Sequence, residues 1–176
     1  MRGSESRSDT IGYAEWTTSV GRPKSLHTMP STHVSLHYHV IFSTKNRERN
    51  ITLDWRSRLH AYMGGVARNI DAVAETVGGV EDHVHILLGL SATHCIADAI
   101  RDIKAVSSRW VHDEMGNSRF AWQEGYGAFT VSPSQRKQVI GYIAKQEEHH
   151  RRRTFKEEYV EFLERSGVKY EERYLW

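Results

Sequence analysis

Two stretches of alternating polarity constrain the fold of this chain more than any other feature. In "SLHYHVIFST" (35–44) and "EDHVHILLGL" (81–90), apolar residues occupy every second position and histidines fall between them. Successive side chains of a strand point to opposite faces of a sheet. Both stretches therefore predict strands with one face on a core, and with a pair of histidines on the opposite, more open face.

The two histidines of each stretch are two residues apart, so both point to the same face of the sheet and could act on one ligand. Residues expected on the core face are Val34, Leu36, Tyr38, Val40 and Phe42, then Val84, Ile86, Leu88 and Leu90. His83 and His85 then stand about 7 Å apart along their strand, close enough for both imidazoles to reach one ion. His37 and His39 join the same face. A pair of histidines on a strand does not by itself define a metal site.

The remaining pattern supplies the other elements of a single domain. Residues 1–31, rich in Ser, Thr, Gly and Arg, are expected to be a flexible tail, which leaves 32–176 as the domain. Asp54 is expected to cap a helix that runs to about Ile70, and Gly78-Gly79 to join two strands in a hairpin. Further expected elements are a helix over 96–115, a strand over 121–132, a helix from a Ser132 capping box to about His150, and a helix over 154–165.

This order of elements predicts the fold class. Strand, helix, strand, strand, helix, strand is the split βαβ arrangement of ferredoxin-like folds, an α+β class with an antiparallel sheet. Its first and third strands are neighbours in the centre of the sheet, and two helices cover one face. The C-terminal helices are additions to this plan.

Composition excludes several classes of function and leaves others open. The net charge of +2 does not itself indicate a polyanion partner, although basic clusters occur at 45–49 and 151–153. Cys95 is the only cysteine, which excludes an intrachain disulfide and a cysteine zinc cluster. No apolar stretch approaches the roughly 20 residues of a membrane span. The expected location is the cytoplasm, in association with DNA if the clusters bind it.

Four motifs together resemble the single-tyrosine HUH transposases, enzymes that mobilise insertion sequences as single-stranded DNA. "HVH" (83–85), preceded by Asp82, is similar to the His-hydrophobic-His motif that names the family. "YHVIFSTKNR" (38–47) resembles its first strand and basic loop, and "KAVSSRW" (104–110) its Lys-x-x-Ser-Ser-Arg segment. "YIAKQ" (142–146) matches its Tyr-x-x-x-Gln motif, whose two named residues share one face of a helix.

The resemblance implies a role for each matching residue. Tyr142, on the C-terminal helices, is the expected nucleophile, which forms a 5′-phosphotyrosine link to single-stranded DNA beside hairpins. His83, His85 and Gln146 are the expected ligands of Mg²⁺ or Mn²⁺, and His39 an expected neighbour of the site. Lys45, Arg47 and Arg109 are candidate DNA contacts. The resemblance also implies a homodimer, with the tyrosine of one subunit beside the histidines of the other.

The residues themselves leave two other functions open. A metal-dependent phosphoesterase would use the same histidines with an activated water and would not need Tyr142. A single-strand-binding module without catalysis would stack bases on the aromatic residues of the sheet face. Within the resembled family, the sequence does not separate an autonomous insertion-sequence enzyme from a domesticated relative that acts on repetitive palindromic elements.

Overall fold

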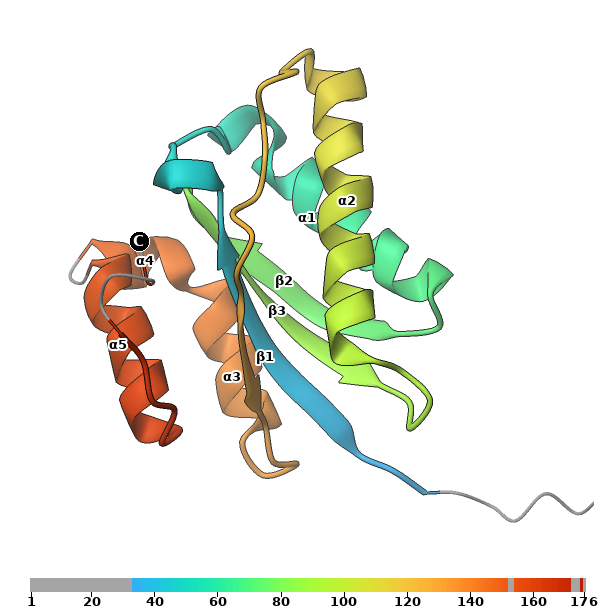
Figure 1. Ribbon diagram of the computed structural model, residues 1–176, viewed down its shortest axis with the longest axis vertical. Helices are drawn as coiled ribbons and strands as arrows, with labels where there is room; N and C mark the ends of the chain where they lie inside the picture. The colour runs from blue at the N-terminus through green and yellow to red at the C-terminus, as the bar shows by residue number, and fades with distance from the viewer. Residues whose placement is uncertain (1–32, 152–153, 172–174, 176) are drawn as a thin grey trace, which may run out of the picture. The chain divides into compact units, whose positions relative to one another are not determined.

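The computed structural model describes residues 33–151, 154–171 and 175, so the expected tail over 1–31 lies outside the described residues. Four antiparallel strands form one sheet: β1 (Leu36–Ser43), β2 (Val73–Gly79), β3 (His83–Leu90) and β4 (Gly127–Thr130). Their order is β2-β3-β1-β4, so the first and third strands are central. The sheet and its helices, drawn in Figure 1, confirm the predicted α+β ferredoxin-like fold.

Two helices, α1 (Leu53–Asn69) and α2 (Ile96–Met115), cover one face of the sheet, as expected. Their apolar residues Leu59, Met63, Ile100 and Ile103 are at most 1% exposed and pack against Val84, Ile86 and Phe42 from the strands. Leu88 belongs to the same cluster, which confirms the predicted core parity. Val34 and Leu36 are the exceptions: Val34 precedes β1 and is half exposed, and Leu36 at the start of β1 is only partly buried and lies outside the cluster.

The histidine face is not open, which corrects the sequence-based expectation. Three further helices cover it: α3 (Arg136–Ala144), α4 (Gln146–His150) and α5 (Phe155–Arg165). The reason lies in two apolar residues that share the parity of the histidines. Ile41 packs with Phe155 and Leu163 of α5, and Leu87 packs with Ile143 of α3. The central strands are therefore buried on both faces.

The hairpin between β2 and β3 exists, but Gly78 and Gly79 are not its turn. Both glycines belong to β2, and Val80 to Asp82 form the connection. A Cβ on Gly78 would lie 2.3 Å from the backbone oxygen of Ile143, so the glycine permits α3 to approach the strand. Gly79 has a φ of +152°, which other residues rarely adopt.

The Ser132 capping box is also wrong as predicted. The Ser132 hydroxyl donates to the side chain of Gln135, and α3 begins only at Arg136. The helix expected to run unbroken to His150 is interrupted at Lys145, whose N–H bonds to the Tyr142 carbonyl in a tighter turn. By contrast, Thr154 caps α5 in a capping box with Glu157.

Smaller differences concern element ends. Helix α1 has Thr52 rather than Asp54 at its N-cap position, and Asp54 lies in its first turn. The fourth strand is reduced to residues 127–130, and Trp122 makes an isolated bridge to Thr44. Among the described residues, no helix combines the length and the apolar character needed to cross a membrane.

Candidate metal and tyrosine site

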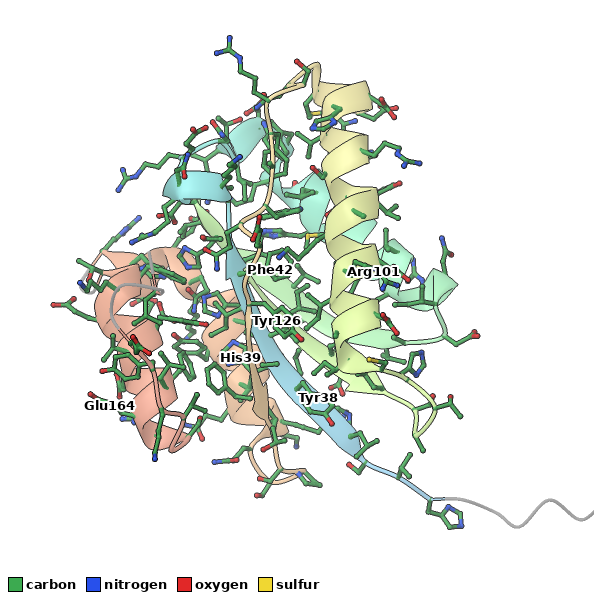
Figure 2. The ribbon with its side chains drawn as sticks, in the orientation of Figure 1. Tyr38, His39, Phe42, Arg101, Tyr126 and Glu164 are labelled. Atoms are coloured by element: carbon green, nitrogen blue, oxygen red, sulfur yellow. The ribbon has the colours of Figure 1, made fainter. Side chains whose placement is uncertain are left out.

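Three of the predicted histidines meet on the face under α3 to α5. His39 comes from β1, while His83 and His85 come from β3, and each is at most 2% exposed. The His85 ring lies 5.1 Å from the His39 ring and 5.1 Å from the His83 ring, between centroids. Figure 2 shows His39 and the adjacent Tyr38 on opposite faces of β1. His37 stands apart, paired with Glu75 at 2.7 Å.

Asp82 fixes the orientation of His83. The His83 Nδ1–H donates to Asp82 Oδ1 over 2.7 Å, which leaves Nε2 to face inward with its lone pair. Arg47 binds the other oxygen of the same carboxylate at 2.7 Å. Although burial alone would raise the pKa of Asp82, the hydrogen bond from His83 and the pairing with Arg47 hold it well below its ordinary value.

His39 does the same for His85. Their atoms His39 Nε2 and His85 Nδ1 are 2.9 Å apart. If His85 Nδ1–H donates to His39, the Nε2 of His85 is left as a lone-pair donor, as a metal ligand requires. His39 therefore lies beside His85, and its role as a neighbour of a metal site stays a prediction.

The inward-facing atoms fit a metal ion. His83 Nε2, His85 Nε2 and Gln146 Oε1 are buried and have no hydrogen-bond partner among the described residues. Buried polar atoms are rarely left unsatisfied, so these three atoms are candidates for binding a ligand. Two imidazole nitrogens and an amide oxygen are a donor set suited to a divalent cation. The three residues expected as ligands thus reach the same region, even though the helix breaks just before Gln146.

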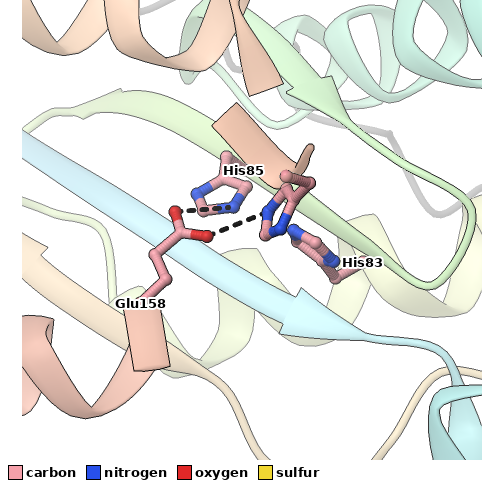
Figure 3. A group of neighbouring side chains, drawn as sticks. His83, His85 and Glu158 are labelled. Carbon is pink, nitrogen blue, oxygen red and sulfur yellow. Dashed lines mark ion pairs between the residues drawn. The ribbon is translucent and has the colours of Figure 1, made fainter. Parts of the chain in front are cut away.

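Two residues that sequence reasoning missed join this group. Ligand atoms of His83, His85, His150 and Glu158 all lie within 4.8 Å of one another. Glu158 approaches His85 Nε2 at 3.7 Å and His150 Nε2 at 2.9 Å, and also accepts from the Gln146 amide at 3.4 Å. Figure 3 shows its carboxylate extending from α5 toward the histidines.

Sequence signals for both residues exist in retrospect. His150 follows Gln146 by four residues, as Gln146 follows Tyr142, so an unbroken helix would carry all three on one row. Glu158 lies on the apolar stripe of α5, between Phe155 and Phe162, where a carboxylate is unusual without a partner.

The electrostatics of the group favour neutral side chains in the absence of a cation. Burial lowers the pKa of His39 to about 4 and also lowers the pKa values of His83 and His85. Burial and the nearby Glu161 raise the pKa of Glu158 to about 8. Neutral imidazole is the form that binds a metal, whereas Glu158 would have to give up its proton to bind a divalent cation.

Tyr142 lies against the histidine cluster of its own chain. Its ring centroid is 5.9 Å from those of His39 and His85, and 5.1 Å from that of His149 on α4. The hydroxyl is buried and without a hydrogen-bond partner among the described residues. Phe162 of α5 contacts the same ring at 5.9 Å between centroids.

The three candidate DNA contacts separate in space. Lys45 and Arg47 lie in the short 3₁₀ turn η1 (Lys45–Arg47) after β1, where Lys45 is exposed. Arg47 is engaged by Asp82 and stacks over the Phe155 ring at 4.7 Å. Arg109 is exposed on α2, in the layer that covers the other face of the sheet, so the fold does not bring it to the histidine cluster.

Comparisons with known proteins agree on one family. The family model described as "Transposase IS200 like" matches residues 32–146. The ISDra2 transposase TnpA of Deinococcus radiodurans is 26% identical over 117 residues, which cover 63% of this chain and 84% of that protein. A crystal structure described as a transposase from Deinococcus radiodurans is similar with a TM-score of 0.55 and 26% identity, over 65% of this chain and 93% of its own.

A more distant structure shares the fold. A REP-associated tyrosine transposase bound to a REP hairpin is similar with a TM-score of 0.52 at 14% identity, over 68% of this chain and 72% of its own. The family match ends at Gln146, so His150 and Glu158 lie beyond it.

Proposed function

Because the chain belongs to the IS200-like transposase family, we propose that it cleaves and rejoins single-stranded DNA through a tyrosine-linked intermediate. The observation that carries this proposal is the position of Tyr142. Its ring packs beside His85, whose Nε2 atom is buried without a hydrogen-bond partner among the described residues. The proposed nucleophile and the two histidines proposed as metal ligands thus lie in one small region of one chain.

The proposed step is a transesterification at phosphorus. The Tyr142 oxygen attacks the scissile phosphate, forms a bond to phosphorus and gives up its proton, while the bond to the 3′ oxygen breaks. The departing oxygen takes up a proton and becomes a free 3′-OH, and the 5′ end stays on the tyrosine. Since the phosphodiester bond count is unchanged, a second 3′-OH can reverse the step and rejoin the strands without ATP.

His83, His85 and Gln146 are the proposed ligands of Mg²⁺ or Mn²⁺ in this reaction. When bound, such an ion polarises the phosphate and offsets its negative charge. The protein contributes orientation. Asp82 and His39 hold the two imidazoles with Nε2 inward, through contacts of 2.7 and 2.9 Å. Burial of the site excludes water that would hydrolyse the covalent link.

Single-stranded DNA with hairpins is the proposed substrate. One structural relative is described as bound to a REP hairpin. Lys45, exposed on the turn after β1, is the proposed phosphate contact that lies on the loop directly after a histidine-bearing strand. Arg47 stays a proposed contact, although it already pairs with Asp82. Arg109 would contact DNA only if the DNA extended around the sheet to α2.

The homodimer stays a prediction. Tyr142 lies beside the histidines of its own chain, which supports a cis arrangement. Mixing Tyr142→Phe with His83→Ala protein tests this directly. A shared site regains cleavage in the mixture, whereas a cis site does not.

The function itself is tested on a denaturing gel. Protein is incubated with Mn²⁺ or Mg²⁺ and labelled single-stranded DNA from the hairpin-bearing flanks of its gene. We expect a covalent protein–DNA band that disappears with chelator and in Tyr142→Phe. Cleavage without a band, unchanged in Tyr142→Phe, would support a phosphoesterase. Binding without cleavage would support a single-strand-binding module.

A further inference from the structure

We propose that His150 and Glu158 complete, with His83 and His85, a closed four-ligand centre for Zn²⁺ or a metal of similar preference. The effect of this centre on DNA cleavage rests on the proposed function, whereas the metal binding itself does not. It concerns α4 beyond Gln146 and α5, which lie outside the family match.

The distances suit tetrahedral coordination. Bonds of about 2.0–2.2 Å at tetrahedral angles place ligand atoms about 3.4 Å apart. One oxygen of the Glu158 carboxylate lies 2.9 Å from His150 Nε2 and the other lies 3.7 Å from His85 Nε2, and ligand atoms taken one from each of the four residues all lie within 4.8 Å of one another. Small side-chain adjustments therefore convert the group into a coordination shell.

The donor types select the metal. Three imidazoles and one carboxylate suit Zn²⁺ and neighbouring transition metals, whereas Mg²⁺ prefers oxygen ligands and retains several waters. Zinc sites with four protein ligands are closed, and those with three leave a position for water or substrate. The set with His150 and Glu158 is thus of the closed kind.

Helix α5 is anchored so that Glu158 stays in this position. Phe155, one turn earlier, packs on the His83 ring at 4.3 Å between centroids. Phe162, one turn later, packs on His39 at 5.0 Å and also contacts Tyr142. The capping box at Thr154 fixes the start of the helix. These contacts hold the carboxylate of Glu158, which is 2% exposed, within the cluster.

Closure has a consequence for DNA. With four protein ligands in place, no coordination position faces Tyr142, and Phe162 covers the tyrosine ring. The reactive arrangement therefore requires Glu158 to leave the cluster. Zn²⁺, by binding the closed set, stabilises α5 in its docked position and opposes the Mg²⁺- or Mn²⁺-dependent reaction.

Metal titration of the full chain tests the site without DNA. We expect Co²⁺ to give the intense visible absorption of tetrahedral coordination, and Zn²⁺ to displace it. Glu158→Ala and His150→Ala should each lower Zn²⁺ affinity, measured by chelator competition, by at least about 100-fold. Residues that only hydrogen-bond to a metal ligand typically cost about 10–100-fold when they are substituted. Glu158→Gln, which preserves side-chain volume, guards against a loss caused by displacement of α5.

Two control substitutions lie on α4, close to His150 in the chain. Glu148→Gln changes an exposed carboxylate of α4, and His149→Ala changes the neighbouring imidazole, which is outside the four-ligand group. Both should retain Zn²⁺ affinity. Wild-type affinity in Glu158→Ala and His150→Ala, or an octahedral Co²⁺ spectrum, would overturn the proposal.

The cleavage readout is kept separate. Zn²⁺ should inhibit adduct formation in Mn²⁺ by the wild type, and Glu158→Ala should need more Zn²⁺ for the same inhibition. Tyr142→Phe should bind Zn²⁺ like the wild type. If Tyr142→Phe still cleaves DNA, the proposed function is wrong and the Zn²⁺ site is unaffected. If substitution of Glu158 and His150 leaves Zn²⁺ affinity unchanged, the Zn²⁺ site is wrong and the proposed function is unaffected.

Discussion

Substitution of Asp82 by Asn tests whether the orientation of His83 matters for metal binding. Asp82 accepts the His83 Nδ1–H at 2.7 Å and the Arg47 guanidinium at 2.7 Å. Asn preserves the shape of the side chain, but it has one acceptor oxygen and carries no charge. Either His83 or Arg47 must then face an amide NH₂ group.

The expected magnitude follows from the place of Asp82 behind a ligand. Loss of such an outer carboxylate typically lowers metal affinity by about 10–100-fold, or about 1.4–2.7 kcal/mol. Arg47 is 31% exposed and can turn to solvent, so we expect the fold to survive. The change should therefore appear in metal affinity more than in unfolding temperature measured with chelator.

The assay is a Mn²⁺ titration of wild type and Asp82→Asn, followed through the electron paramagnetic resonance signal of free Mn²⁺. Arg47→Gln is the matched control, because it removes the outer partner and keeps the carboxylate; its loss should be smaller. Equal Mn²⁺ affinity of Asp82→Asn and the wild type, in folded protein, would show that Asp82 does not support metal binding through His83.

Three further expectations concern packing, pH and DNA contact. Gly78→Ala should destabilise the protein by about 1–3 kcal/mol in denaturant unfolding, because the new Cβ meets the Ile143 oxygen at 2.3 Å, while Gly64→Ala in open space should not; equal stability of both variants would contradict it. Burial, with the charge of Arg56, lowers the pKa of His60 to about 4, so its neutral form contributes stability above pH 6.5 that is lost as pH falls toward 4. His60→Leu should flatten the pH dependence of unfolding in that window, and an unchanged profile argues against it. Lys45→Ala should lower the slope of the binding constant against salt concentration, both as logarithms, by about one counterion. The same measurement on Arg109→Ala tests whether α2 contacts DNA, and an unchanged slope would mean that the substituted residue does not bind DNA.

The alternation of side chains along the strands, with the order of elements, predicted most of the fold. The alternation around His39 and His85 fixed which face is core, and the order of elements gave the central position of β1 and β3. Local signals were less dependable. Gly78 and Gly79 permit a close helix contact and a special backbone angle instead of forming the turn. The residues at Ser132 have the sequence pattern of a capping box, but they do not cap a helix.

The sequence predicted the part of the candidate site whose residues belong to short motifs, including Tyr142 and Gln146 in "YIAKQ". His83 and His85 are two residues apart on a strand, so parity and motif both identify them. Glu158 reaches the histidines because α5 packs back across the sheet, through contacts such as Ile41 with Leu163. Such long-range packing leaves only a faint local sign, namely a carboxylate within an apolar stripe.

The central claim is that Tyr142 forms a covalent bond to DNA. The most direct measurement is peptide mass spectrometry of protein incubated with Mn²⁺ and hairpin-bearing single-stranded DNA, then trimmed with nuclease. We expect a nucleotide mass, joined through its 5′ phosphate, on the Tyr142 side chain. A nucleotide on another residue, or cleaved DNA with an unmodified Tyr142 peptide, would contradict it.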